Sequence, residues 1–241
     1  MVTSYVCFDL ETTGLSPEKD EIIEIGAVKV VEGKVVGRFS RFIKPDEPIS
    51  SLVEGLTGIS NAMVADAGPT DRIIYDFLEF CEEYPVIGHN LMFDYRFTWR
   101  YAKKYYMDFN KEGLDTLKIA RTVLADLPSK SLGNLCEYYG IVNASAHRAY
   151  HDALATAKLY QTLKHYFSEE YAELFEAAPL QWRQKKVQPA TKRQKEYLME
   201  LRKYHKIEIN SNLETLTRSE ASRLIDKIML QYGRMEYRRR R

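Results

Sequence analysis

Two spacings of apolar residues follow one another along the chain, and together they predict a mixed α/β protein. Near the N-terminus, an apolar run of β-favouring residues at 5–8, a run rich in β-branched residues at 22–31 and a further run at 35–43 predict three strands. The segment Glu32-Gly33-Lys34 has the composition of a tight turn between the second and third runs. We therefore expect these strands to form an antiparallel meander.

Helical spacing dominates from residue 70 onward. Apolar residues at intervals of three and four predict a helix that starts near 69–70 and is ended by Pro85, and further helices at 93–105, 117–124 and 131–139. The same spacing predicts a long helix that begins near His147 or Ala149 and extends to about 167. A short apolar run at 86–88 predicts a buried strand between two of these helices, and Leu114-Asp115-Thr116 is expected to form a last short strand. A turn at a helix start is expected at 56–60. The pattern thus predicts a sheet of five strands flanked by helices.

The C-terminal part of the chain differs from the rest. Residues 179–190 are polar and basic, lack apolar periodicity and are bracketed by prolines, which predicts a linker. Two helices are expected after it, beginning with capping-box sequences at Thr191 and Thr217. We therefore expect an α/β domain at 1–178, a linker at 179–190, a small two-helix module at 191–233 and a basic tail at 234–241.

Charge divides the chain near the same place. The formal net charge is +1, but residues 1–180 contain 18 Lys and Arg against 27 Asp and Glu, whereas residues 181–241 contain 17 against 7. The net charges of the two parts are therefore −9 and +10. The basic part indicates a polyanionic partner, although a solvated charged helix has the same composition. Its apolar stripes would equally allow docking onto the first domain or another protein.

Cysteine and hydropathy patterns argue against several classes of protein. Cys7, Cys81 and Cys136 are widely spaced and odd in number, which disfavours a disulfide framework or a thiolate zinc site. No apolar run approaches the roughly 20 residues of a membrane span, and the chain begins with strand-like sequence rather than a signal peptide. No G-x-G-x-x-G motif follows a predicted strand, which disfavours a dinucleotide oxidoreductase. We expect a cytoplasmic protein without a membrane partner.

Candidate chemistry begins at the end of the first strand. Asp9 and Glu11 are two residues apart, so both side chains project from one face of the strand while Leu10 points into the protein. Neighbouring carboxylates repel one another, and a divalent cation between them removes the repulsion; oxygen ligands of this kind suit Mg²⁺ or Mn²⁺. A solvated strand end before a turn has the same sequence, so the pair by itself leaves both interpretations open.

Two more acids lie at or just before predicted helix starts, where the helix dipole favours negative charge. Asp94 follows His89 and Asn90, and Asp152 follows His147 by five positions. Taken singly, each acid is explained by a helix N-terminus or a solvated turn. Their combination with the pair in the first strand makes a shared site the better interpretation.

These segments together resemble the DnaQ-like, DEDDh-type 3′–5′ exonucleases, which include proofreading subunits and domains of bacterial replicative DNA polymerases. The resemblance extends from about residue 2 to residue 167. Its motifs follow the family's order: Phe-Asp-x-Glu-Thr-Thr-Gly-Leu at 8–15, Ile-Ile-Glu-Ile-Gly-Ala at 22–27, Leu-Thr-Gly-Ile at 56–59, Gly-His-Asn-x-x-Phe-Asp at 88–94 and His-x-x-x-x-Asp at 147–152. One departure is His151, which stands where many members carry a second Asp.

The resemblance implies an RNase H-like fold whose central mixed sheet brings Asp9, Glu11, Asp94 and Asp152 together. It also implies two Mg²⁺ or Mn²⁺ ions, bridged by Asp9 and completed by Glu11 and Asp152, with Asp94 acting mainly through bound water. Two such ions lower the pKa of an attacking water and neutralise charge on the leaving 3′-oxygen. A general base is still needed, and His147 is the candidate because an imidazole ordinarily titrates near neutral pH.

The family places the terminal nucleotide against the turn after the first strand. Backbone amides around Thr12 and Thr13 would reach the 3′-hydroxyl, and Leu15 would wedge beside the base. Asn90 and Phe93 would line the same pocket. A turn leucine and a helix-start phenylalanine are equally compatible with a place in the core.

The sequence thus predicts a metal-dependent 3′–5′ exonuclease, similar to the epsilon subunit of DNA polymerase III, that releases nucleoside 5′-monophosphates from single-stranded or frayed DNA ends. Proofreading or repair is the expected setting, with a DNA polymerase as a possible protein partner. One alternative is an oligoribonuclease-like exoribonuclease, because the choice depends on how the pocket treats a 2′-hydroxyl. Another is an inactive nucleic-acid-binding or polymerase-scaffolding protein, against which the intact set of acids argues.

Overall fold

The computed structural model describes residues 1–182, 188–209 and 212–235. These residues fall into two compact units, Met1–Trp182 and Arg183–Arg241. Within the described residues, no helix is long and apolar enough to cross a membrane.

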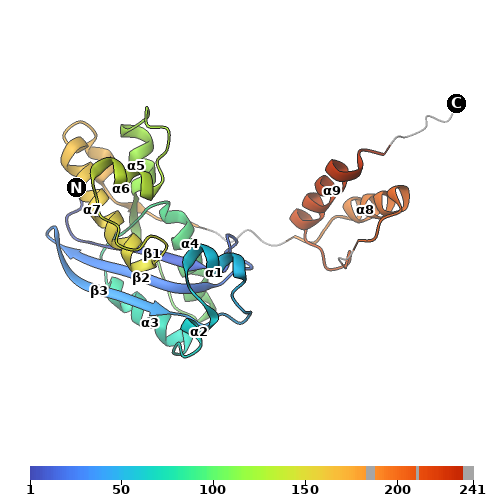
Figure 1. Ribbon diagram of the computed structural model, residues 1–241, viewed down its shortest axis with the longest axis horizontal. Coiled ribbons are helices and arrows are strands. Elements are labelled where there is room, and N and C mark those ends of the chain that lie inside the picture. Colours follow the sequence, from blue (N-terminus) through green and yellow to red (C-terminus); the bar gives the residue numbers. More distant parts are fainter. Residues whose placement is uncertain (183–187, 210–211, 236–241) are drawn as a thin grey trace. The chain divides into compact units, whose positions relative to one another are not determined.

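A mixed sheet organises the first unit (Figure 1). Its strands are β1 (Tyr5–Thr12), β2 (Ile22–Val31), β3 (Lys34–Phe42), β4 (Val86–Gly88), β5 (Glu112–Asp115) and β6 (Ala178–Pro179), in the order β3-β2-β1-β4-β5-β6. The pairs β1–β4 and β4–β5 are parallel, and the other neighbours are antiparallel. The expectation of five strands was therefore one too low, because β6 spans two residues and is too short to show a periodic pattern.

The expected antiparallel meander is confirmed in strands β1, β2 and β3. Val31 pairs with Lys34, so Glu32 and Gly33 are the two central residues of the turn between β2 and β3. Both have positive φ angles, 48° and 76°, as a type I′ hairpin turn requires. Glycine adopts this conformation without a steric penalty, which explains its place in the turn.

Helices cover the sheet on both faces (Figure 1). They are α1 (Ser51–Thr57), α2 (Asn61–Val64), α3 (Thr70–Cys81), α4 (Leu91–Lys104), α5 (Thr116–Val123), α6 (Leu132–Tyr139) and α7 (Ala149–Phe167), followed by the 3-10 turn η1 (Ala172–Phe175). The five helices predicted from apolar spacing all occur. Helix α3 ends at Cys81, before the proline that was expected to end it, and the other predicted bounds lie within two residues of those observed. Helix α1 was not predicted; it spans seven residues, and Thr57 is its one buried residue.

Alternating side chains of β1 enter two separate cores. Val6, Phe8 and Leu10 pack into the core that also contains buried residues of α3 and α4. Tyr5 and Cys7 pack into the core that contains residues of α5, α6 and α7. Residues of β1 with odd numbers therefore face α7, and this alternation decides where the acids at the end of the strand lie.

The first unit continues beyond its expected end at residue 178. The backbone N–H of Leu180 donates to the carbonyl of Lys111 at 2.8 Å, and the Leu180 carbonyl accepts from the Tyr95 hydroxyl at 3.2 Å. The ring of Trp182 then packs edge-on against Trp99, with centroids 5.1 Å apart. Residues 179–182, placed in the linker by sequence, thus belong to the first unit, while 183–187 lie outside the described residues.

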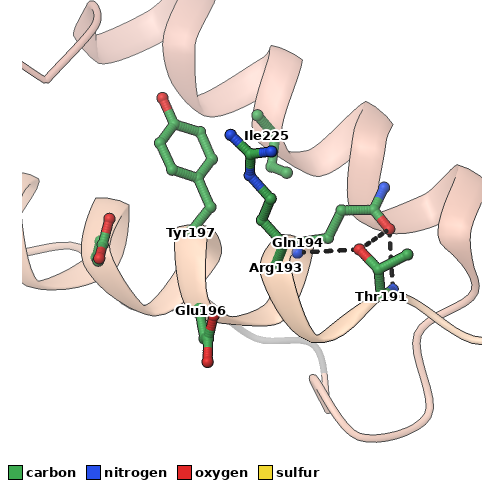
Figure 2. A pocket seen from close by; sticks show the side chains of 7 residues that line it. Thr191, Arg193, Gln194, Glu196, Tyr197 and Ile225 are labelled. Atoms are coloured by element: carbon green, nitrogen blue, oxygen red, sulfur yellow. Dashed lines mark hydrogen bonds between the residues drawn. The ribbon is translucent and has the colours of Figure 1, made fainter.

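The second unit is built from α8 (Lys192–His205) and α9 (Arg218–Tyr232), and both capping boxes form as predicted. Leu198, Leu201, Ala221 and Ile228 form its small core. A hollow of about 430 Å³ lies beside α8. Figure 2 shows Arg193 and Tyr197 on one side of this helix, with Glu196 pointing to the other. Residues 236–241 of the expected tail lie outside the described residues.

Candidate active site

The end of β1 and the first turn of α7 bring three carboxylates together. Asp9 and Glu11 follow Cys7 on the face of β1 that packs against α7, and Asp152 lies in the first turn of that helix. One carboxylate oxygen of each lies within 4.8 Å of those of the other two. Across the described residues, this is the one group of His, Cys, Asp and Glu side chains close enough together to hold a metal ion.

Two residues of β2 explain how closely α7 approaches the sheet. A Cβ atom at Gly26 would lie 2.0 Å from the backbone nitrogen of Tyr150, so only glycine leaves room for the helix. Buried Glu24 accepts hydrogen bonds from the Arg148 guanidinium at 3.0 and 3.1 Å and from the Ala149 backbone N–H at 3.2 Å. The start of α7, and with it Asp152, is therefore fixed to β2.

Asp94 supports the same strand from α4. Its Oδ1 accepts a hydrogen bond from the backbone N–H of Leu10 at 3.0 Å, and the residue is buried. Burial raises the pKa of the Asp94 carboxyl well above its ordinary value, against the opposing effect of this hydrogen bond. Asp94 lies outside the group of three close carboxylates, and its expected role through bound water stays a prediction.

Burial and mutual repulsion disfavour the charged forms of these acids. Burial is the main reason that the pKa of Asp9 lies well above its ordinary value, and the charges of Asp94, Asp152 and Glu11 raise it further. The pKa of Glu11 rises from 4.5 to about 8, through burial first and then through the charges of Asp152 and Glu24. In the metal-free protein the site therefore holds protons that isolated carboxyl groups would have lost at neutral pH.

This set of donors fits a divalent cation. Asp9, Glu11 and Asp152 offer oxygen ligands within a short distance, and no lysine or arginine of the described chain forms an ion pair with them. Hard cations such as Mg²⁺ and Mn²⁺ prefer carboxylate oxygen. The charge of Arg148 already lowers the pKa of Glu11, and a bound cation would add positive charge between the three carboxylates and lower the pKa of each.

The loop before α7 carries His147 and closes on Asp152. The His147 backbone N–H donates to Asp152 Oδ2 at 2.8 Å, and Asn143 Nδ2 donates to Oδ1 at 2.6 Å. Burial raises the pKa of Asp152, and these hydrogen bonds oppose the rise. His147 has a left-handed φ of 62° and an exposed side chain, whereas the ring of His151 packs against Tyr150. Only His147 thus lies on the loop held by Asp152.

The turn after β1 is tied into a rigid loop. Thr13 forms two hydrogen bonds of 2.8 Å with the backbone of Glu21, one from its own N–H and one to its hydroxyl. The Thr13 amide therefore already has an acceptor in Glu21, and its contact with a 3′-hydroxyl stays a prediction. Thr12 donates its hydroxyl hydrogen to the Gly14 carbonyl at 2.6 Å, and Leu15 is 85% exposed. Leu15 is thus free of the core and available for contact.

Helix α4 fixes this loop from the other end. Arg100 donates to the carbonyl of Asp20 at 2.9 Å and to that of Pro17. The hydroxyl of Tyr101 accepts from the backbone N–H of Ile22 at 3.3 Å. The same helix begins with the residues expected to line the pocket, so one rigid element supports both groups of candidate substrate contacts.

Asn90 and Phe93 occupy different environments at the start of α4. Asn90 has a left-handed φ of 70°, is exposed, and donates its backbone N–H to Asp115 Oδ1 at 2.9 Å. Phe93 is partly buried and packs against Phe97, with ring centroids 5.1 Å apart. Both remain predicted substrate contacts, although part of Phe93 belongs to the core.

Several residues that shape the site were not assigned a role from sequence. They are Glu24, Gly26, Asn143, Arg148 and Arg100. Glu24 offered a signal, because a glutamate inside an apolar β-run must find a partner when it is buried. Gly26 lies in the motif at 22–27, but its local pattern does not show that a helix approaches it. Arg100 and Arg148 make contacts more than 80 positions away along the chain, and Asn143 lies in a segment without periodic pattern.

Known proteins are similar to this chain over much of its length. The family model for exonucleases of the RNase_T type matches residues 6–160. The DNA polymerase III PolC-type of Caldanaerobacter subterraneus subsp. tengcongensis is 42% identical over 156 residues, which make up 65% of this chain and 11% of that protein. The corresponding protein of Thermotoga maritima is 39% identical over 158 residues, 65% of this chain and 12% of that protein. The chain therefore spans only 11–12% of the length of these relatives.

Solved structures give the same fold. E. coli exonuclease I in complex with a dT13 oligonucleotide has a TM-score of 0.65 at 22% identity, covering 72% of this chain and 44% of that one. Exonuclease X in complex with 5′ overhanging duplex DNA has a TM-score of 0.55 at 26% identity, covering 70% and 98%. The mixed sheet with helices on both faces is shared with these exonucleases. Because the family model matches more than half of its residues, the chain belongs to the exonuclease family of the RNase_T type.

Proposed function

We propose that the first unit is a metal-dependent exonuclease that hydrolyses phosphodiester bonds at the 3′ end of DNA and releases nucleoside 5′-monophosphates. The observation that carries this proposal is the convergence of Asp9, Glu11 and Asp152 from segments far apart in the sequence, beside a loop with an exposed histidine. Family membership supports the class of reaction. The similarity to PolC-type polymerases supports DNA as the substrate.

Asp9, Glu11 and Asp152 would hold the cations, which we propose to be two Mg²⁺ or Mn²⁺ ions. When bound, such ions lower the pKa of a nucleophilic water and neutralise charge on the leaving 3′-oxygen. Asp94 anchors the backbone of β1 between the first two ligands through the Leu10 N–H. The acids must be ionised to act as ligands, so the protons retained through burial and repulsion are lost when a cation binds.

His147 is the proposed general base. Its side chain is exposed, and its backbone is held at 2.8 Å from Asp152 Oδ2, so the imidazole is kept near the ligand acids without being bonded to them. A neutral imidazole accepts the proton of the attacking water. His151 has no such position, because its ring lies against Tyr150.

The terminal nucleotide would contact the loop after β1 and the start of α4. Exposed Leu15 is the candidate wedge beside the base, and Thr12, Thr13, Asn90 and Phe93 are the remaining proposed contacts. The hydrogen bonds of Arg100 hold the loop in one conformation, so little ordering is needed when substrate binds.

The second unit is proposed to be an accessory module that contacts single-stranded DNA. It lies outside the residues matched by the exonuclease family model. Of the 17 Lys and Arg in 181–241, ten lie in the described residues together with six of the seven acids, so most of the basic excess lies in 183–187 and 236–241. Association with a DNA polymerase is a further proposal, supported by the relatives' names.

A degradation assay tests the function. Single-stranded DNA, duplexes with matched or mismatched 3′ ends, and RNA of the same sequence carry a 5′ label and are incubated with Mg²⁺, Mn²⁺ or EDTA. We expect stepwise shortening from the 3′ end of DNA that depends on the cation and is lost in the Asp9→Ala protein. Faster degradation of RNA would favour the exoribonuclease alternative, and an inactive wild-type protein would favour a scaffolding role.

A further inference from the structure

We propose that Asn143 is a positioning residue for the candidate metal site, because its amide orients the Asp152 carboxylate and secures the loop that carries His147. Asn143 lies outside the sequence motifs and was not among the predicted site residues. Its importance for catalysis depends on the proposed function, whereas its effect on cation binding is measurable without any nuclease activity.

The geometry uses both oxygens of the Asp152 side chain. Asn143 Nδ2 donates to Oδ1 at 2.6 Å, and the His147 backbone N–H donates to Oδ2 at 2.8 Å. Two donors on opposite oxygens restrain rotation of the carboxylate about its last torsion. Since a carboxylate has about four lone-pair sites, each oxygen keeps acceptor capacity for a cation shared with Asp9 and Glu11.

The oxygen of the same amide pays an energetic penalty, because it is buried without a hydrogen-bond donor in the part of the chain that the structure describes. Asn143 Oδ1 is buried and has no hydrogen-bond partner among the described residues. Reversing the amide would place this oxygen against an oxygen of Asp152, so the charge of the aspartate determines the orientation. A buried acceptor without a partner is unfavourable, and the short bond to Asp152 is the contact that offsets it.

The same bond fixes the loop. Residues 141–148 contain no helix or strand, and His147 has the left-handed φ of 62° that residues other than glycine rarely adopt. Asp152 holds this segment at two points, through Asn143 and through the His147 backbone. Loss of the first point leaves His147 attached by a single backbone bond, so the imidazole and the carboxylate lose their common orientation together.

The test measures Mn²⁺ binding to the full-length protein by electron paramagnetic resonance of the free ion, without DNA. We expect Asn143→Ala to weaken Mn²⁺ affinity about 10–100-fold, the usual effect of removing a hydrogen bond to a metal ligand. Asn143→Leu, which keeps the side-chain volume but not the amide, should show the same loss. Val142→Ala, at the exposed neighbouring position, is the matched control and should bind Mn²⁺ like the wild type.

Kinetics separate this proposal from the proposed function. On single-stranded DNA, both Asn143 variants should lose kcat while KM stays within about twofold, because the substrate contacts are elsewhere. Mn²⁺ affinity within twofold of the wild type in both Asn143 variants would overturn the positioning role, even in an active nuclease. A wild-type protein that binds Mn²⁺ and loses this binding in both variants, yet degrades no nucleic acid, would uphold the positioning role and contradict the nuclease assignment.

Discussion

Replacement of Glu11 by glutamine tests whether the buried acid cluster lowers the free energy of unfolding of the metal-free protein. The pKa of Glu11 rises from 4.5 to about 8 on folding, through burial first and then through the charges of Asp152 and Glu24. At about 1.4 kcal/mol per pKa unit, this difference corresponds to roughly 5 kcal/mol for a fully buried group. Glu11 keeps part of its surface in water and shares its charge with neighbours, so we expect about 1–3 kcal/mol.

The sign follows from the direction of the shift. Below pH 4.5 Glu11 is protonated in both the folded and the unfolded chain, so it adds no pH dependence. Between pH 4.5 and about 8 the unfolded chain loses the proton while the folded protein keeps it, so the free energy of unfolding falls as pH rises. The Glu11→Gln protein lacks this loss and should be more stable than the wild type at pH 8.5, with little difference at pH 4.5.

Urea denaturation of both proteins in EDTA at the two pH values measures the effect, with Glu47→Gln as the control at an exposed glutamate. Adding Mn²⁺ should reverse the order at pH 8.5, because the wild type binds the cation more tightly and gains more stability from it. A Glu11→Gln protein that is no more stable than the wild type in EDTA at pH 8.5 would refute the argument that the close carboxylates destabilise the metal-free fold.

Three further predictions concern the base, the loop and the second unit. His147→Ala should lower the rate of DNA hydrolysis about 10²–10⁴-fold and flatten the rise of that rate with pH, whereas His151→Ala should change the rate far less. If the pH-rate profiles show the larger loss in His151→Ala, His147 is not the general base. Arg100→Ala removes the hydrogen bonds that hold the 13–21 loop and should raise KM about tenfold with little change in kcat, with Arg96→Ala as the control. An unchanged KM would contradict a role for this loop in substrate binding. If two to four charges of the second unit contact single-stranded DNA, deleting 183–241 should reduce the slope of log affinity against log salt by roughly 1.5–3. An unchanged slope and affinity would exclude contact with nucleic acid. A loss of thermal stability on deletion would indicate that the second unit docks onto the first.

Local pattern was sufficient for most elements of the fold. The apolar stripe of α3, the two capping boxes of the second unit and the turn at Gly33 each depend on residues within a few positions of one another, and each formed as predicted. Helix α1 and strand β6 escaped prediction for a physical reason. Helix α1 spans seven residues and strand β6 spans two, so both are too short for a repeating pattern to stand out.

The end of the first unit, at Trp182, could not be predicted from composition. Residues 179–182 have the composition of a linker, yet Leu180 and Trp182 complete the edge of the sheet and the packing around Trp99. Their contacts are made with Lys111, Trp99 and Tyr95, which lie 69, 83 and 85 positions earlier, and composition does not reveal such contacts.

The sequence by itself determined the chemistry that the site offers. Alternation along β1 put Asp9 and Glu11 on one face, and the family resemblance added Asp94, His147 and Asp152. Successive side chains of a strand point to opposite faces because of backbone geometry alone, so the sequence shows which residues of a strand share a face.

Only the tertiary structure decided how those groups are held. Gly26 lets α7 approach β2, Glu24 takes the Arg148 guanidinium across 124 positions of the chain, and Asn143 closes the loop onto Asp152. The same fold showed that the Thr13 amide is already bonded to Glu21 and that Leu15 is exposed. These facts depend on which segments the topology brings together, and the physical requirement to pair buried charges then selects the partner.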